Sequence, residues 1–136
     1  MSYAMSEPLQ TAVFNALRTD DALLSLVGTD IYDAMPTGTL PATYVRLGAE
    51  TVRDASDNVG SGALHRFTVS VITTEPGFAG IKAVSGAISD VLHGADLALS
   101  RGHLVALQFE RAVAARRDGG STRQIDMRFR ARVSDD

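Results

Sequence analysis

Cysteine is absent from the 136-residue sequence, and lysine is nearly so, with Lys82 alone against twelve arginines. The lack of cysteine excludes a disulfide framework, a thiolate metal site and a cysteine nucleophile. Long apolar runs are also missing, since none approaches the roughly 18 residues that a membrane-spanning helix needs. Residues 1–10 contain no basic segment followed by an apolar core. We therefore expect neither a signal peptide nor a membrane segment.

Motifs of catalysis and cofactor binding are missing too. The three histidines, His65, His93 and His103, match no metal-ligand spacing, and His93 is placed to interact with a helix C-terminus. Gly60 and Gly62 lie in a GSG segment that lacks the further glycines of a dinucleotide loop and the Lys-Ser or Lys-Thr of a phosphate-binding loop. No serine lies in a G-x-S-x-G or Ser-x-x-Lys motif. We therefore expect no enzyme, no cofactor and no bound metal.

The composition suits a packed globular protein. Hydrophobic residues make up 45% and charged residues 21% of the chain, which is close to the globular average and allows a core. The length predicts a single domain spanning residues 1–136, with residues 1–5 as a loose N-terminal tail. The net charge of −3 gives no global reason to bind nucleic acid, because phosphates require a concentrated basic surface.

Helix signals appear in two parts of the sequence. Ser6 is a candidate N-cap for a helix over residues 6–18. Asp20 and Asp21 can cap a second, short helix that Gly28 ends. Helical spacing returns in residues 78–93. The positions expected to be buried in the first helix are Leu9, Val13, Phe14 and Leu17.

Alternation of apolar and polar residues predicts the strands. Residues 44–52, 64–74 and 104–114 alternate with a period of two, and residues 31–32 form a brief extended piece. The segment from Arg53 to Gly62 reads RDASDNVGSG and has almost nothing to bury. We expect it to be a long, mobile hairpin loop. The residues of the 104–114 strand that we expect to be buried are Val105, Leu107 and Phe109.

The strictest alternation occurs in the last predicted strand, residues 122–133. Its polar face ends in three arginines at alternate positions, Arg128, Arg130 and Arg132. Arginines in such a row on a strand contact water, neighbouring carboxylates or a subunit partner. We refer to these three residues as the arginine row. The dry face is expected to consist of Ile125, Met127, Phe129, Ala131 and Val133.

A tight turn joins the last two strands. The Asp-Gly pair that ends at Gly119 is a strong hairpin signal. Centring the turn on Gly119 keeps both dry faces on one side, which places Phe109 opposite Phe129 and Glu110 opposite Arg128. A carboxylate is therefore expected beside the arginine row.

The order of elements is αα-ββ-α-ββ, with strands joined by hairpins rather than by helical crossovers. This order predicts an α+β fold with a mainly antiparallel sheet of about five strands and with helices packed on one face. No internal repeat or low-complexity tract divides the chain.

Two features are candidates for contact with a partner. The arginine row is better suited to pairing with Glu110 or with an acid of another subunit than to binding a free anion. The predicted loop supplies Arg53, Asp54, Asp57 and Asn58, whose two carboxylates lack the ligand density of a calcium site. We predict that these residues form a subunit or partner interface.

Three long segments together resemble the small tail-completion, or tail-terminator, proteins of long-tailed bacteriophages and of gene transfer agents. The likeness is one of layout, because no short catalytic motif carries it. It covers nearly the whole chain from Leu9 onward. The segments are LQTAVFNALRTDDALLSLVG with DIYDAMPTGTLPATYVRLG, then GSGALHRFTVSVITTEPGFAGIKAVSGAISDVLHG, and LVALQFERAVAARRDGGSTRQIDMRFRARV.

The resemblance implies a non-enzymatic part of a virion or gene-transfer-agent particle, made in the host cytoplasm. Such a protein forms a ring, a hexamer in this expectation, at the head-proximal end of the tail tube, where it ends tube polymerisation and joins the tail to a head or neck connector protein. Its partners would be itself, the tail-tube protein and the connector. DNA would pass through the lumen without specific binding, which an acidic subunit favours.

Two alternatives remain open at this point. Another neck protein, such as a head-completion adaptor, has the same size and ring habit, although the strands predicted here favour the terminator. A small-molecule-binding α+β domain is the second alternative, since a sheet covered by helices can enclose a pocket. A group of perturbed acids and histidines in a cleft would support that second alternative.

Overall fold

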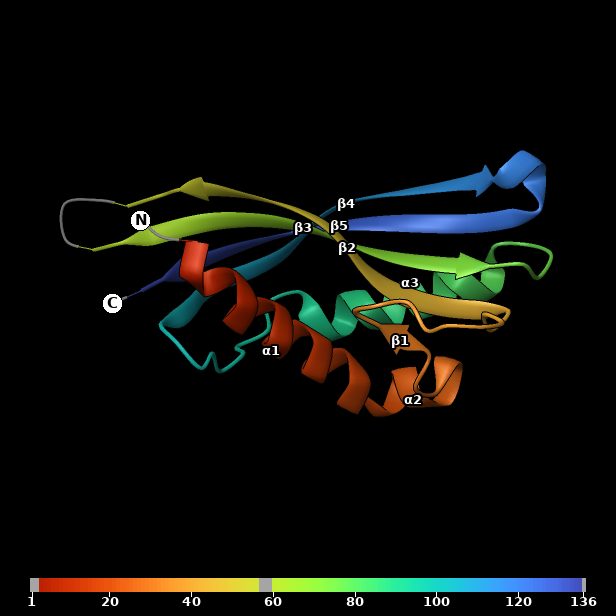
Figure 1. The fold of residues 1–136 in the computed structure, drawn as a ribbon, viewed down its shortest axis with the longest axis horizontal. Helices are drawn as coiled ribbons and strands as arrows, with labels where there is room; N and C mark the ends of the chain where they lie inside the picture. Colours follow the sequence, from red (N-terminus) through yellow and green to blue (C-terminus); the bar gives the residue numbers. More distant parts are fainter. Residues whose placement is uncertain (1–2, 57–59, 136) are drawn as a thin grey trace.

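Five strands of the described part of the chain form one sheet, and the helices lie on one side of it (Figure 1). The computed structural model describes residues 3–56 and 60–135. None of the described helices is long and apolar enough to cross a membrane. The helical elements are η1 (Tyr3–Met5), α1 (Ser6–Thr19), α2 (Asp21–Val27), α3 (Ala79–Leu92) and η2 (Asp118–Gly120). The strands are β1 (Ile31–Tyr32), β2 (Thr43–Asp54), β3 (Gly62–Thr73), β4 (His103–Arg117) and β5 (Thr122–Ser134).

The strands are arranged in the order β1-β2-β3-β5-β4. The three long pairings are antiparallel, whereas the two-residue β1 pairs with β2 in parallel. The α+β fold with a mainly antiparallel sheet is thus confirmed, and β1 makes the sheet mixed. Residues 33–42 carry the chain back from β1 to the start of β2, which is the kind of crossover that a parallel pair requires.

The predicted signals around α1 and α2 are confirmed in part. The side chain of Asp20 accepts a hydrogen bond of 3.1 Å from the Leu23 backbone N–H, whereas Asp21 is the first residue of α2. Gly28, with a φ of +59°, is the C-cap residue that follows Val27. The prediction that Ser6 caps α1 is wrong. A preceding turn, η1, occupies the capping position, and the Ser6 hydroxyl instead donates to the Glu50 carboxylate.

The expectation of a loose tail over residues 1–5 is wrong for residues 3–5, and residues 1–2 lie outside the described part. Met5 is 2% exposed, and Gly102 leaves the space that the Met5 thioether fills. The Tyr3 hydroxyl donates to Glu50 on β2. Burying a methionine side chain contributes about 1.5–3 kcal/mol, which is enough to hold a short terminal segment against the sheet.

The core lies between the helices and one face of the sheet. All five residues predicted to be buried on β5 are buried there, together with Leu9, Val13 and Leu17 of α1 and the apolar stripe of α3. Phe14, also predicted to be buried, is only partly so. Phe129 is fully buried at the centre, stacked on Phe67 at 5.7 Å and edge-on to Phe109 at 5.8 Å between ring centroids. The predicted register of Phe109 opposite Phe129 is confirmed.

Strand β4 lies at an edge of the sheet and contains two register shifts. The first, between Leu104 and Ala106, turns Val105 outward, so that it is 53% exposed and the prediction of a dry Val105 is wrong. Leu104 is buried in its place and Leu107 is buried as predicted, whereas Phe109, also expected to be buried, is 38% exposed. Near Leu107 the outer edge of β4 is covered by the end of α3: Gly94 N–H donates to the Leu107 carbonyl at 2.7 Å.

The two ends of the molecule differ. The described ends of the chain lie at the same end of the sheet as the β2–β3 connection, and the β4–β5 turn lies at the opposite end (Figure 1). The turn is built from Asp118, Gly119 and Gly120, all with positive φ. It confirms the hairpin predicted from the Asp-Gly pair, and the paired strands extend to it from both sides.

Candidate partner-binding surface

The face of the sheet that carries no helix is strongly basic. Because side chains alternate along a strand, the residues between the buried positions of β2, β3, β5 and β4 share this uncovered face. Among the described residues, eight arginines and two carboxylates lie on it, which gives a local charge of +6 in a protein whose net charge is −3. We call this the basic face. Its members are Arg46, Arg53, Arg66, Arg111, Arg117, Arg128, Arg130 and Arg132, with Glu110 and Asp126.

Glu110 occupies the second register shift of β4, between Phe109 and Arg111. We predicted Glu110 directly opposite Arg128, but the cross-strand partner of Arg128 is Arg111. The carboxylate nevertheless lies 3.6 Å from Nη1 of Arg128 and 3.2 Å from Nε of Arg66. The predicted pairing of Glu110 with the arginine row is therefore confirmed, and the bulge lets one carboxylate serve two guanidinium groups.

Several arginines of the basic face stand directly opposite one another. Arg66 is the cross-strand partner of Arg130, and Arg111 that of Arg128. Like charges at such positions destabilise a sheet by several tenths of a kcal/mol. Arg130 is exposed and forms no ion pair with any described residue. Because this arrangement lowers the stability of the isolated sheet, we infer that these arginines contact a partner.

Asp126 neutralises part of the other half of the basic face. Its carboxylate accepts hydrogen bonds from Ser70 at 2.6 Å and from Gln124 at 2.8 Å, and Arg117 lies 3.6 Å away. Burial raises the pKa of the Asp126 carboxyl, but these two hydrogen bonds and the nearby guanidinium groups outweigh burial, so its pKa is lowered. The group is therefore a stable negative charge among the arginines.

The residues predicted from the β2–β3 loop do not lie together. Arg53 and Asp54 belong to β2 rather than to a mobile loop, since β2 continues to Asp54 and β3 begins at Gly62. Arg53 is on the basic face, whereas Asp54 is paired with the buried Ala63 and points to the opposite side. Asp57 and Asn58 lie outside the described residues.

The described residues of this connection are anchored to the strands. Asp54 accepts hydrogen bonds from the backbone and hydroxyl of Ser56, which lower the pKa of its carboxyl. The Ala55 carbonyl accepts a hydrogen bond of 3.1 Å from Arg132. The arginine row is thus connected to the β2–β3 loop as well as to Glu110.

A second polar group lies between η1 and the sheet. Glu50 accepts hydrogen bonds from the hydroxyls of Tyr3 and Ser6, and its other oxygen is 3.5 Å from Nδ1 of His65. Burial raises the pKa of the Glu50 carboxyl, but the hydrogen bonds, led by that from Ser6, outweigh it and lower the pKa. His65 is fully buried, so its ring is inaccessible to a substrate, and the group joins elements of the fold.

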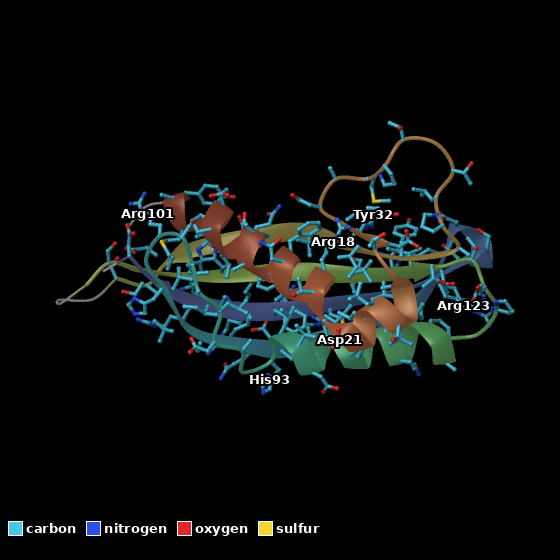
Figure 2. All side chains as sticks on the ribbon, turned by 90° about the horizontal axis from the view of Figure 1, so that it is seen from below. Arg18, Asp21, Tyr32, His93, Arg101 and Arg123 are labelled. Atoms are coloured by element: carbon cyan, nitrogen blue, oxygen red, sulfur yellow. The ribbon has the colours of Figure 1, made fainter. Side chains whose placement is uncertain are left out.

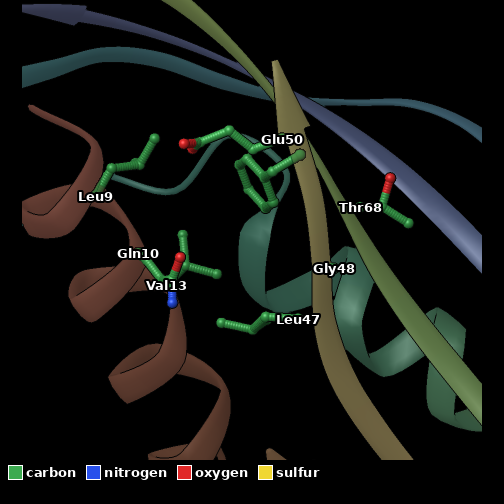
Figure 3. A pocket seen from close by; sticks show the side chains of 8 residues that line it. Leu9, Gln10, Val13, Leu47, Gly48, Glu50 and Thr68 are labelled. Atoms are coloured by element: carbon green, nitrogen blue, oxygen red, sulfur yellow. The ribbon is translucent and has the colours of Figure 1, made fainter. Parts of the chain in front are cut away.

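The hollow beside Glu50 is small. It lies between α1 and β2, lined in part by Leu9, Val13 and Thr68 (Figure 3), and has room for about one water molecule, about 20 Å³. Two wider depressions of about 400 and 320 Å³ lie at the surface, and no histidine lines either. The described residues contain no group of three or more acids and histidines that could hold a metal ion.

Sequence reasoning found only part of the basic face. It selected five of its members: the arginine row, Glu110 and Arg53. It missed Arg46, Arg66, Arg111, Arg117 and Asp126, which lie on the four strands β2 to β5 and which only the sheet brings together. For Arg46 the available signal was alternation, because it lies between Val45 and Leu47, whereas Arg111 and Arg117 each follow another charged residue. His93, predicted to serve a helix end, is confirmed as the C-cap residue of α3 and accepts a hydrogen bond from the Phe109 N–H at 3.0 Å.

Comparison with known proteins shows what this architecture is similar to. No curated protein sequence matches the chain significantly. Among solved structures, a chain of a structure described as "Virion of native gene transfer agent (GTA) particle" matches with a TM-score of 0.94 and 56% sequence identity, covering 98% of this chain and 99% of that one. The model of the family "Tail completion protein gp17" matches residues 11–134. The protein is thus a member of the gp17 tail completion family.

Proposed function

We propose that this protein is a non-enzymatic structural component of a phage-like tail or gene transfer agent particle. In this proposal several copies, six in a closed ring, cap the head-proximal end of the tail tube, stop its polymerisation and join it to a head or neck connector protein. The observation that carries the proposal is the full-length likeness to a chain of a gene transfer agent virion, together with the family match.

The basic face gives the proposed ring its lateral contacts. A ring subunit needs a surface that receives the next copy. The arginine row with Glu110 lies on the side of the sheet that no described helix covers (Figure 1), and Arg130 of this row forms no ion pair with a described residue. Contact with the tube or the neck is assigned to Asp57 and Asn58 of the β2–β3 connection and to Arg53 and Asp54, which end β2. With the arginines engaged by protein, the remaining surface is acidic, so DNA passes the lumen without being retained.

The test is the native mass of the purified protein, measured by light scattering first alone and then with the tail-tube protein of the same particle. We expect a ring-sized species, formed either by the protein alone or on addition of tube protein. Co-sedimentation with preformed tubes, one ring per tube, should accompany it. Tail tubes assembled with the protein should also be shorter and more uniform than tubes assembled without it.

The control is an unrelated acidic protein of similar size, which should change neither the mass nor the tube length. A protein that stays monomeric when tube protein is added would contradict the proposal. Binding to a head connector without binding to tubes would then identify the protein as a neck adaptor instead.

A further inference from the structure

Charge is divided between the two sides of this molecule. The basic face carries +6, so the rest of the chain carries −9. Much of that negative charge lies on the helical side. Residues 6–33 and 79–97, which contain α1, α2 and α3, hold seven carboxylates against Arg18 and Lys82, a net charge of −5. One chain therefore presents two surfaces of opposite sign, one on each side of the sheet.

The acidic surface has an exposed region around α2 and the end of α3. Asp21 lies at the start of α2, and α2 packs against α3, whose last turn contains Asp90 and is followed by the labelled His93 (Figure 2). Asp21 and Asp90 are exposed and form no ion pair with a described residue. We call the exposed acids of this region, Asp21, Asp90 and Asp96, the acidic helix surface.

Apolar side chains accompany both charged surfaces. Leu24 and Leu26 of α2 are 40% and 48% exposed, and Val113, which lies on the basic face opposite Asp126, is 39% exposed. Protein interfaces commonly combine such an apolar centre with arginine and a charged rim. The two surfaces are therefore opposite in charge, and both carry exposed apolar side chains.

The sign of the charges decides how copies can associate. Two basic faces cannot meet in a two-fold contact, because +6 would face +6. A contact between different surfaces of successive copies brings opposite charges together. Contacts of this head-to-tail kind form a ring when the rotation from one copy to the next closes on itself, and an open filament when it does not. The charge division thus favours the type of association that a ring requires.

We propose that the basic face of one copy docks on the acidic helix surface of the next copy of the same chain. This inference rests on the proposed ring and assigns its subunit contact. Arg111 and Arg130, which form no ion pairs with described residues, contact the region of Asp21 and Asp90 of the neighbour, and Val113 approaches Leu24 and Leu26.

The experiment uses charge reversal in both surfaces. Variant A carries Arg111→Glu and Arg130→Glu, which set acids opposite Arg128 and Arg66 and so favour folding. Variant B carries Asp21→Arg and Asp90→Arg. If circular dichroism shows that B has lost its structure, Asp90→Arg with Asp96→Arg replaces it. Native mass is measured for each variant and for an equimolar mixture, with tail-tube protein present where the wild type requires it.

Each variant alone should associate about tenfold or more weakly than wild type. The mixture should recover the ring, because the altered face of A fits the altered helices of B and the native face of B fits the native helices of A. The control, Arg18→Glu with Lys82→Glu, has the same net charge as variant A but leaves the basic face intact, and it should assemble like wild type.

Three results would overturn the inference. Wild-type assembly by variant A would show that the basic face is not the contact. A mixture that stays unassembled would show that the face meets another partner, such as the tube protein. Retention of a short DNA duplex by wild type but not by A, with unchanged native mass, would assign the face to nucleic acid. If wild type fails to assemble even with tubes, the proposed function fails first and this inference with it.

Discussion

Glu50 is the residue at which the N-terminal segment, the sheet and a buried histidine meet. Its carboxylate holds Tyr3 and Ser6 through their hydroxyls and lies beside His65. Sequence patterns could not reveal this group, because the residues are separated by up to 62 positions and each has an ordinary local setting. The hydrogen bonds explain why residues 3–5 are fixed although their sequence contains no signal for it.

The lowered pKa of Glu50 predicts a stability contribution that depends on pH. A carboxyl whose pKa is lower in the folded than in the unfolded state stabilises the fold above its unfolded pKa, about 4.3, and the contribution is lost as the pH falls through the folded pKa. Glu50→Gln should reduce the free energy of unfolding at pH 7 by about 1 kcal/mol. Urea titrations of both proteins at pH 7 and pH 3 measure it. The difference in free energy of unfolding between the two proteins should be smaller at pH 3. A difference that is independent of pH would contradict the prediction.

The absence of a side chain at Gly102 leaves room for Met5, whose burial holds residues 3–5 against the sheet. It has a φ of +63°, and a Cβ added there would overlap the Ser134 carbonyl oxygen and the Met5 thioether. Gly102→Ala should destabilise the fold by about 1–3 kcal/mol through strain and displacement of Met5, measured as a lower midpoint of thermal unfolding. Gly94→Ala is the matched control, with a φ of +73° but no atom within 4 Å of the added Cβ. Equal losses in both variants would show that backbone strain alone is responsible.

Among the elements, β5 could be read almost completely from the sequence and β4 only in part. The alternation of Ile125 to Val133 decides which face is buried, because a strand on a helix-covered sheet must hide every second residue. The Asp-Gly turn then fixed the pairing of Phe109 with Phe129. The bulges of β4 have no local signature. They arise where the strand bends at the sheet edge, and they reversed the expected direction of Val105 and shifted Glu110 by one position.

The first helices and the candidate surface show the same limit. The Asp20 cap and the Gly28 end are local features, and both were predicted. Ser6 has the composition of a cap, but a tertiary contact with Glu50 took its hydroxyl. Half of the basic face was missed because its arginines come from different strands, and only their register shows that they share one side of the sheet.

For the whole molecule, the division of charge predicts a marked response to salt. Raising ionic strength from 0.1 M to 1 M shortens the Debye length from about 10 Å to about 3 Å, so association of copies through opposite charges should weaken by about tenfold or more. Sedimentation at the two salt concentrations measures this. The free energy of unfolding of the subunit should change little, since its core is apolar. Stronger assembly at 1 M salt would indicate a mainly apolar contact instead.

The polarity of the molecule also provides a way to see its direction inside a particle. Both described ends of the chain lie at one end of the sheet and the β4–β5 turn at the other, and β4, with 15 residues, spans about 45 Å. A peptide tag on either terminus and a second tag inserted at Gly119 would therefore stand far apart. Antibody fragments bound to each tag in electron micrographs would tell which end of the subunit is directed toward the capsid.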